Sequence, residues 1–216
     1  MNLLYPRTCP VCGNPIPFNR TYCSCSDEDA QKIPPDVGDL SNTDDPLDPF
    51  TAVWYYNGRV RFDLLRLKFQ RNASLAKPFG LALAKRVNDV FSGVSFDCVT
   101  FVPMTNDDLR ERSLNQSALI AQWVARANFI QCSALLQKVR STPNQHQLNQ
   151  SDRIANLKDA FAPTDLVQPG STVLLVDDIK TTGTTLRRCR DTLLEAGVKQ
   201  VYCAAYAMSD FYSLDF

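Results

Sequence analysis

Apolar and polar positions in the C-terminal third of the chain follow two different spacings. Residues 172–177 begin as a β-branched and apolar run, which is typical of a strand buried on both faces. Residues 184–196 then follow a helical pattern that stops before Gly197, a residue suited to the end of a helix. Residues 200–207 form another strand-like run. This alternation predicts an α/β fold with a parallel sheet and flanking helices.

The middle of the chain repeats the same alternation. Asn57-Gly58 is a strong turn signal after the first strand-like run, and residues 104–111 read as a polar loop. We expect strands over residues 51–56 and 97–103, and helices over residues 59–69, 75–91, 118–127 and 154–161. Residues 139–153 form a long polar segment with little periodicity, typical of a lid or binding loop.

Four cysteines near the N-terminus form a separate feature: Cys9, Cys12, Cys23 and Cys25. A C-x₂-C knuckle and a second pair predict four thiolates around one structural Zn²⁺. The second pair is C-x-C, a shorter spacing than the usual C-x₂-C. Three alternatives therefore stay open: a degenerate ribbon, Asp27 as a substitute ligand, or unpaired thiols. The other cysteines lie on apolar elements and are predicted to be small core residues: Cys98, Cys132, Cys189 and Cys203.

Charge is balanced overall but unevenly distributed. The 216 residues carry 23 basic and 23 acidic side chains, so the net charge gives no indication of binding to nucleic acid or to an acidic membrane. Residues 27–50 hold eight acids against one lysine and read as an exposed connector. Residues 58–86 hold eight bases against one acid. We therefore expect a Cys-rich segment at 1–26, a linker at 27–50 and one larger domain at 51–216.

Neither a membrane span nor a secretory signal is predicted. No run of eighteen apolar residues occurs, and the N-terminus lacks a charged region followed by an apolar one. A cytoplasmic location is the expectation, in which the cysteines stay reduced or metal-bound.

Two carboxylates and a Thr/Gly loop carry the most informative chemistry. Asp177 and Asp178 end the strand-like run, at the edge of an open sheet where ligands bind. Small hydroxyl residues around a glycine then lead into a helix, which suits an anion: Lys180, Thr181, Thr182, Gly183, Thr184 and Thr185. Together they indicate a ligand with sugar hydroxyls, phosphate and a divalent cation. The competing interpretation is a surface turn with a threonine cap. A receiver domain is excluded because only 38 residues follow Asp178.

This arrangement resembles the phosphoribosyl-diphosphate (PRPP) motif of the type I phosphoribosyltransferases. The whole chain except the acidic linker resembles their ComF branch, the competence-protein and GntX-like family, whose N-terminal zinc finger corresponds to the cysteine ribbon. The matching positions are Tyr56, Gly58, Leu67-Lys68, Val102-Pro103, Glu111-Arg112, Asn115-Gln116, Thr142, Gln145, Leu148, Arg153, Asn156 and Phe161. Departures are Phe101, Ser113 and Leu114, the last two where the family has Gly-Phe. A glycine there lets backbone amides approach a diphosphate.

The resemblance implies roles for individual residues. Asp177 and Asp178 would meet the ribose hydroxyls and act as the catalytic pair, and residues 181–185 would hold the 5′-phosphate. Candidates for the diphosphate or a closing loop are basic or polar: Arg66, Lys68, Arg110, Arg112, Arg140, Thr142, Gln145 and Arg153. The single histidine, His146, is interpreted as a bystander.

Three functions remain open at this stage. The first is a Mg²⁺-dependent phosphoribosyltransferase (a glycosyltransferase) with an unidentified acceptor, acting through an oxocarbenium-like state. The second, implied by the resemblance, is a competence factor that handles incoming single-stranded DNA with a helicase partner. Its basic segment 58–86, with Trp54, Tyr55, Tyr56 and Phe69, would track phosphates and stack bases, although such aromatics are more often core. The third is a PRPP sensor without turnover.

Overall fold

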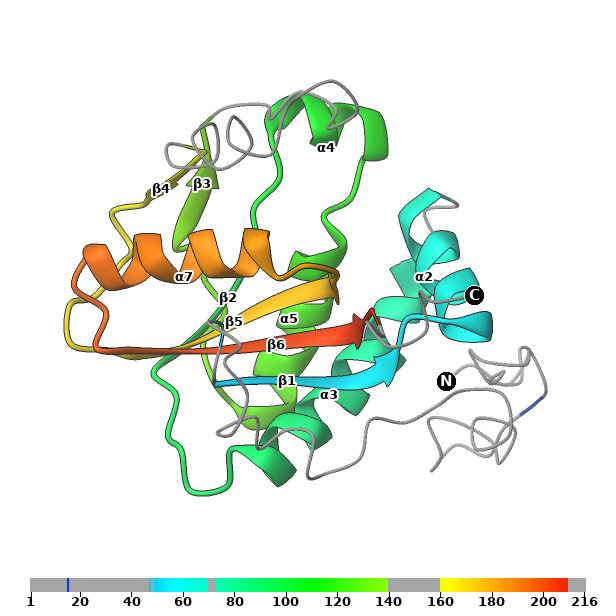
Figure 1. The fold of residues 1–216 in the computed structure, drawn as a ribbon, viewed down its shortest axis with the longest axis horizontal. Coiled ribbons are helices and arrows are strands. Elements are labelled where there is room, and N and C mark those ends of the chain that lie inside the picture. The colour runs from blue at the N-terminus through cyan, green and yellow to red at the C-terminus, as the bar shows by residue number, and fades with distance from the viewer. Residues whose placement is uncertain (1–14, 16–46, 48, 70–72, 140–159, 210–216) are drawn as a thin grey trace, which may run out of the picture.

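A computed structural model describes residues 15, 47, 49–69, 73–139 and 160–209 (Figure 1). The four N-terminal cysteines, nearly all of the acidic connector and most of the polar segment 139–153 lie outside these residues. Predictions that fall there therefore stay predictions.

A four-stranded parallel sheet in the order β1-β6-β5-β2 forms the centre of the fold. Its strands are β1 (Phe50–Tyr55), β2 (Cys98–Phe101), β5 (Thr172–Lys180) and β6 (Gln200–Met208). The two central strands bury apolar side chains on both faces, from Val173 to Val176 in β5 and from Cys203 to Ala207 in β6. This pattern is what a parallel sheet covered on both sides requires.

One face of the sheet packs on α2 (Gly58–Phe69), α3 (Ala76–Val90) and α5 (Gln116–Asn128). A short 3₁₀ turn, Ala73–Leu75, precedes α3. Phe79 of α3 stacks on Tyr206 of β6 with ring centroids 4.0 Å apart. Gly80 allows α3 and α5 to approach closely, since a Cβ there would lie 2.3 Å from the Cβ of Trp123. A glycine inside a helix costs stability, and this close approach of the two helices explains why glycine occurs at this position.

The opposite face is covered by α7 (Thr184–Glu195), which buries Leu186, Cys189 and Leu193 against β5 and β6. Beside α7 lies a two-stranded antiparallel sheet of β3 (Leu136–Lys138) and β4 (Phe161–Pro163). Figure 1 shows this small sheet and the short helix α4 (Asn106–Arg112) above the main sheet, on the side of α7. The fold is thus three layers, with an added hood formed by β3 and β4.

The structure confirms most predicted elements of the larger domain. The predicted strands at 51–56, 97–103, 172–177 and 200–207 are present, as are the helices at 59–69, 75–91, 118–127 and 184–196, with small shifts at their ends. Gly197 has a positive φ of 93° immediately after α7 ends, as predicted. Cys189 and Cys203 are buried core residues, whereas Cys98 and Cys132 are half-buried.

Three predictions at this level were wrong. Residues 104–111 are not a loop, because Thr105 and Asp108 form a capping box that starts α4. β5 extends to Lys180, so Lys180 belongs to the strand rather than to the turn after it. Phe161, predicted as the end of a helix, begins β4, where it pairs with Lys138. Residues 154–159 of that predicted helix lie outside the described residues.

In the part of the chain that the structure describes, every helix is too short or too polar to cross a bilayer.

Candidate functional site

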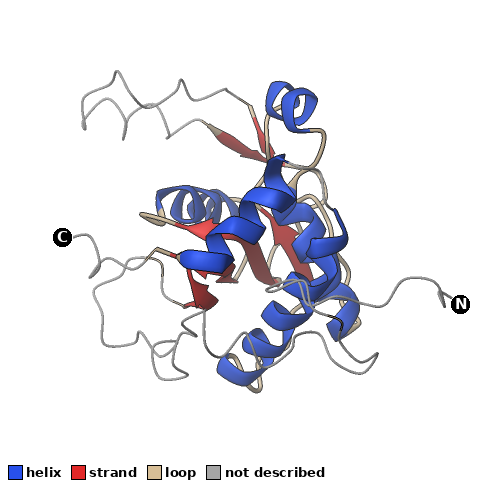
Figure 2. Cartoon of the chain, turned by 90° about the vertical axis from the view of Figure 1, so that its right-hand side faces the viewer, coloured by secondary structure: helices blue, strands red, loops and turns tan. Residues whose placement is uncertain are grey.

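The carboxyl ends of the main-sheet strands meet at one edge of the molecule. The arrows of β1, β5 and β6 point to the right in Figure 1, and Figure 2 looks onto that edge. The connections to α2, α4, α5 and α7 all leave the sheet there. In open parallel sheets this edge is where ligands bind. Asp177, Asp178 and the Thr/Gly loop all lie at it.

Asp177 is buried at this edge and held by α5. Its side chain is 8 % exposed, and its Oδ1 accepts a hydrogen bond of 2.7 Å from the Ser117 hydroxyl. The same Oδ1 accepts a bond of 2.9 Å from the backbone N–H of Asp178. Burial, and then the neighbouring Asp178 charge, raise the pKa of Asp177 well above its ordinary value, although the Ser117 bond opposes the shift.

Asp178 is less buried than Asp177 and makes a local contact. Its Oδ1 accepts a hydrogen bond of 2.8 Å from the backbone N–H of Ile179. The pairing of β5 with β6 runs through Asp177 and Ile179, with Ala205 and Ala207 as their partners. The two adjacent carboxyls thus lie near the carboxyl end of a central strand, one buried and one half-buried.

The Thr/Gly loop begins α7. Gly183 is in the left-handed region, with φ 73°, and its carbonyl accepts the first helical bond from the Arg187 N–H at 2.9 Å. The Thr182 and Thr184 hydroxyls lie 2.9 Å apart. Thr181, Thr182 and Thr185 are exposed, and a helix N-terminus carries a partial positive charge. The loop therefore has exposed hydroxyls and backbone N–H groups of the kind that hold anions, and the binding of a phosphate there stays a prediction.

Lys180 lies differently from its predicted companions. It is 5 % exposed, and its Nζ lies 5.0 Å from the centre of the Phe50 ring. The side chain therefore runs inward beneath the loop rather than out beside the threonine hydroxyls. A direct contact between Lys180 and a phosphate stays a prediction.

The start of α5 forms a second wall of the edge. The Asn115 side chain caps the helix by accepting from the Ala118 N–H at 3.0 Å, and donates to the Val102 carbonyl at 3.1 Å. The Val102 N–H in turn donates to the Val176 carbonyl at 3.0 Å. These bonds tie the segment after β2 to the strand that carries Asp177. They give Asn115, which the family resemblance matched, a positioning role.

Ser113, where the family has a glycine, ends α4 in the left-handed region with φ 63° and ψ −8°. Its N–H donates to the Leu109 carbonyl at 2.7 Å. Glycine adopts this conformation without strain, whereas a residue with a Cβ does not. The structure thus gives a local reason for a glycine here, in addition to the predicted approach of amides to a ligand.

The structure does not gather the predicted basic residues at one point. Arg66 pairs with Asp63 at 3.3 Å, and Lys68 lies over the exposed Phe69 ring at 5.7 Å. Arg110 pairs with Asp107 at 3.6 Å on the exposed face of α4. The Arg112 side chain lies outside the described residues, as do Arg140, Thr142, Gln145 and Arg153. Their predicted role with the diphosphate stays open.

Two site residues were absent from the sequence-based prediction. Ser117 holds Asp177 across 60 residues of sequence, and its signal was only a serine one position beyond the matched Asn115-Gln116. Lys138, the last residue of β3, pairs with Asp108 of α4 at 3.6 Å and links the hood to the helix after β2. No pattern around Lys138 marks it, because β3 is only three residues long.

The surface of α2 combines cations with exposed rings. Phe62 is 50 % exposed, with the Arg59 guanidinium 5.0 Å and the Arg66 guanidinium 5.8 Å from its ring centre. Both arginines pair with the buried Asp63, at 3.4 and 3.3 Å. Burial raises the pKa of Asp63, while the two arginines oppose that shift. By contrast, Trp54 is buried in the core, and Tyr55 and Tyr56 are half-buried.

Oxygen donors at the edge suit a hard cation held together with a phosphorylated ligand. Asp177, Asp178 and the threonine hydroxyls are the oxygen ligands that Mg²⁺ prefers, usually alongside waters and substrate phosphates. Within the described residues, no three His, Cys, Asp or Glu side chains cluster as a complete protein-only metal site. The predicted Zn²⁺ ligands Cys9, Cys12, Cys23 and Cys25 lie outside the described residues.

Comparisons with known proteins agree with this geometry. The family model of the phosphoribosyl transferase domain matches residues 125–209, which include β5, the Thr/Gly loop, α7 and β6. The chain is 29 % identical over 203 residues to the DNA utilization protein YhgH of Salmonella typhimurium, covering 90 % of this chain and 82 % of that protein. It is 27 % identical over 189 residues to competence protein F of Haemophilus influenzae, covering 83 % of this chain and 81 % of that one.

Among solved structures, the chain is similar to the glutamine PRPP amidotransferase of B. subtilis, at 28 % identity and a TM-score of 0.43. The match covers 62 % of this chain but only 26 % of that enzyme. The family match and the sheet described above agree on a type I phosphoribosyltransferase fold for the larger domain.

Proposed function

Because the chain belongs to the ComF family of the phosphoribosyltransferase superfamily, we propose that it binds PRPP with Mg²⁺ at the carboxyl edge of its sheet. We further propose that this binding serves the uptake or use of DNA, since its relatives are named as a DNA utilization protein and a competence protein. One observation carries the ligand proposal. Two adjacent carboxyls and an exposed hydroxyl loop at a helix N-terminus lie side by side, Asp177 and Asp178 next to residues 181–185.

The Thr/Gly loop takes the 5′-phosphate in this proposal. Thr181, Thr182 and Thr185 present exposed hydroxyls, and the first turn of α7 presents N–H groups without helical partners. Gly183 allows the sharp left-handed turn that brings these groups together. The positive end of the α7 dipole favours the same anion.

The carboxyl pair takes the ribose hydroxyls. A sugar hydroxyl donates to an ionised carboxylate, and such charged hydrogen bonds are stronger than neutral ones. Asp177 is already oriented by Ser117, so its position does not have to be ordered when the ligand arrives. Burial raises the pKa of Asp177 in the empty protein, and a hydroxyl that donates to its carboxylate lowers that pKa again.

If an acceptor binds, the reaction is a displacement of diphosphate at the anomeric carbon of the ribose. The bond from that carbon to the diphosphate oxygen breaks with its electron pair leaving on the diphosphate, and the acceptor's lone pair forms the new bond. Mg²⁺ bound to the ligand would supply neutralisation of the leaving charge. The protein's own contribution is to hold the ribose and the 5′-phosphate in place, since most of the catalysis in such a step comes from positioning.

Two parts of the proposal rest on sequence alone. Lys68, Arg110, Arg112, Arg140, Gln145 and Arg153 remain the candidates for the diphosphate or a closing loop. Cys9, Cys12, Cys23 and Cys25 remain the candidates for a structural Zn²⁺. Zinc content of the purified protein, compared with that of a Cys9→Ser and Cys12→Ser variant, tests the second point.

Calorimetry followed by a diphosphate-release assay on the same sample tests the ligand and separates two functions. A transferase or hydrolase binds Mg²⁺–PRPP and releases diphosphate, whereas a PRPP sensor binds it and releases none. No saturable heat with Mg²⁺–PRPP would overturn the proposed ligand. Omission of Mg²⁺ is the matched control for the cation.

A second candidate function is binding of single-stranded DNA, favoured by the surface of α2. Phe62 and Phe69 are exposed rings with cations over them, and residues 58–86 are strongly basic. Exposed rings stack bases and nearby cations contact phosphates, largely without sequence preference. Of the rings predicted for this role, Trp54 is buried and Phe69 is exposed, and the exposed Phe62 is added here as a further candidate.

Substitution of the exposed rings tests the second candidate. Phe62→Ala is expected to weaken binding of a labelled oligonucleotide by about 1–3 kcal/mol, the usual contribution of one stacked base. Affinity should also fall steeply with salt, because phosphate contacts release counterions. Phe129→Ala, at an exposed ring immediately after α5, is the matched control. An affinity that is flat in salt and equal in both variants would exclude this surface. A helicase partner remains a prediction from the resemblance.

A further inference from the structure

Leu47 is the point at which the acidic connector meets the larger domain. It lies within residues 27–50, which were interpreted as an exposed connector, yet its side chain is 0 % exposed. Two positions later, the Pro49 carbonyl accepts a hydrogen bond of 2.9 Å from the Cys203 N–H, and β1 begins at Phe50. The backbone that follows Leu47 is therefore fixed to β6 of the main sheet. The end of the connector is thus packed into the domain.

Leu47 packs against the turn of the Thr/Gly loop. A Cβ built on Gly183 would lie 3.5 Å from the Leu47 Cδ2, an ordinary van der Waals contact, and 3.1 Å from the Lys180 Cε. Gly183 is buried and turns the chain with φ 73°. Because a glycine has no side chain to fill the space beside it, other residues fill that space. Leu47 is one of them, although it is far from Gly183 in sequence.

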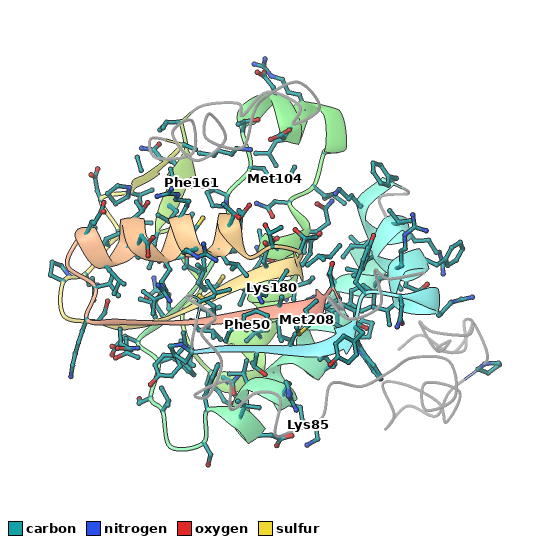
Figure 3. The ribbon with its side chains drawn as sticks, in the orientation of Figure 1. Phe50, Lys85, Met104, Phe161, Lys180 and Met208 are labelled. Atoms are coloured by element: carbon teal, nitrogen blue, oxygen red, sulfur yellow. The ribbon has the colours of Figure 1, made fainter. Side chains whose placement is uncertain are left out.

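The same apolar cluster joins the connector to the start of α7. Leu47, Phe50 and Leu186 all belong to the buried cluster between α7 and the main sheet, and Leu186 lies in the first turn of α7. In the view of Figure 3, Phe50 and Lys180 lie close together beneath α7, in agreement with the 5.0 Å between the lysine Nζ and the centre of the ring. The phosphate loop therefore rests on side chains from the connector, β1, β5 and α7.

Support of this kind affects how readily the loop binds an anion. A glycine-containing turn has more conformational freedom than other turns, and ordering it when a ligand binds reduces affinity. A fixed side chain against Gly183 removes part of that freedom beforehand. The hydroxyl residues Thr181, Thr182 and Thr185 are exposed, whereas Leu47 is completely buried. Leu47 can therefore hold the loop in place without occupying the position of a ligand.

We infer that Leu47 is a positioning residue for the phosphate loop, which anchors the end of the connector against Gly183 and strengthens phosphate binding without contacting the ligand. This inference rests on the proposed function, since it concerns the same loop. Because Leu47 belongs to the connector, the affinity of the site then depends on the connector being held in this position. A merely structural role for Leu47 predicts a loss of stability with no specific effect on phosphate binding.

Leu47→Ala and Leu193→Ala form a matched pair of variants. Leu193 is completely buried in the same cluster but lies about 14 Å along α7 from Thr184. Calorimetry with Mg²⁺–PRPP, ribose 5-phosphate and inorganic phosphate, and thermal unfolding without ligand, are measured on the same samples. Both variants should unfold at a lower temperature, because each leaves a cavity. Only L47A should bind the three probes more weakly, on the order of tenfold, which corresponds to ordering about one residue of backbone on binding.

Further variants make the effect specific to packing at this position. Leu47→Met keeps an apolar side chain of similar volume and should bind like the wild type. Leu47→Val leaves a smaller cavity and should lose less affinity than L47A, and it takes the place of L47A if that variant does not fold. Val198→Ala, buried in the same cluster beyond the end of α7, takes the place of L193A on the same condition.

The outcomes distinguish this inference from the proposed function. Wild-type affinity in folded L47A, or an equal loss of affinity in L47A and L193A, overturns the role of Leu47 and leaves PRPP binding intact. Weaker binding of ribose 5-phosphate and phosphate by L47A alone, without any binding of PRPP by the wild type, supports Leu47 and overturns the proposed ligand. If neither L47A nor L47V folds, Leu47 is a structural residue and the inference is wrong. Binding of no probe by the wild type overturns both.

Discussion

The Ser117 hydroxyl lies 2.7 Å from Oδ1 of Asp177 and joins the first turn of α5 to the carboxyl end of β5. The two residues are 60 positions apart in sequence. This bond orients the more buried of the two site carboxyls before any ligand binds. It also supplies a hydrogen-bond donor to a carboxyl that is buried and therefore has little access to other donors.

Ser117→Ala should therefore destabilise the protein and weaken ligand binding. Removal of one partner leaves a buried polar group less satisfied, at a cost of about 1–3 kcal/mol. Urea unfolding measures the first effect, and calorimetry with Mg²⁺–PRPP measures the second. Ser95→Ala, at an exposed position before β2, is the control and should change neither. Wild-type stability and affinity in S117A would show that the bond orients nothing.

The raised pKa of Asp177 predicts how stability depends on pH. Burial and the Asp178 charge favour the protonated carboxyl in the folded protein. The folded state then binds more protons than the unfolded state between the ordinary value of 3.8 and the raised pKa. The contribution of Asp177 to the free energy of unfolding is therefore complete below pH 3.8, and it decreases as the pH rises from 3.8 towards the raised pKa.

Asp177→Asn should remove this slope, because asparagine resembles the protonated acid in shape and carries no proton to lose. The measurement is the difference in unfolding free energy between wild type and D177N across pH. The free energy of unfolding of D177N should increase relative to that of the wild type as pH rises. Asp165→Asn, an exposed position, controls for the loss of one negative charge. A difference between wild type and D177N that stays constant with pH would contradict the assigned shift.

Ser113→Gly is expected to stabilise the protein. Ser113 ends α4 with φ 63°, a conformation in which glycine has no Cβ strain. The gain should be about 1 kcal/mol, reduced by the greater freedom of glycine in the unfolded chain. Urea unfolding measures it. Ser113→Ala retains the Cβ and should gain nothing, so equal stabilisation by both variants would show that the hydroxyl, rather than the backbone, was responsible.

Gly80→Ala is expected to destabilise the packing of α3 on α5. The added Cβ would lie 2.3 Å from the Trp123 Cβ and 2.8 Å from the Ile120 carbonyl oxygen, and neither atom is the end of a flexible side chain. Overpacking of this kind costs about 1–3 kcal/mol, more than the ~1 kcal/mol that alanine gains over glycine in a helix. Thermal unfolding measures the net effect. A more stable G80A would mean that the two helices separate at little cost.

Much of the site was predictable because its chemistry is local in sequence. Asp177, Asp178 and residues 181–185 form one continuous strand–turn–helix segment, and each part has its own composition. The same holds for the main-sheet strands, whose apolar runs show that they are buried on both faces. A local signal of this kind requires no knowledge of distant contacts.

The residues that were missed depend on distant contacts or on short elements. Ser117 is an ordinary serine until β5 is placed beside it. The strands β3 and β4 have three residues each, too short to show a period, and 22 residues separate them. The capping box at Thr105 and Asp108 was visible in the sequence, but the helix that it starts is polar and only seven residues long.

Exposure on α2 also escaped the sequence pattern. Phe69 was named among the possible stacking rings, but Phe62 was not, and only Val60, Leu64 and Leu67 among the apolar residues of α2 are buried. Spacing alone does not tell a core position from an exposed ring that lies under two arginines. The buried Asp63 reveals the difference, because it holds both arginines on the Phe62 side.

The most direct test of the central claim is calorimetric titration of Mg²⁺–PRPP into the wild type and into the Asp177→Ala, Asp178→Ala double variant. The account predicts saturable binding to the wild type. In the folded double variant it predicts a loss of at least about 100-fold, since charged hydrogen bonds contribute about 1.5–3 kcal/mol each. Asp165→Ala is the control and should bind as the wild type does. Equal affinity of the wild type and the double variant, or no binding by the wild type, would contradict the claim that this edge is a PRPP site.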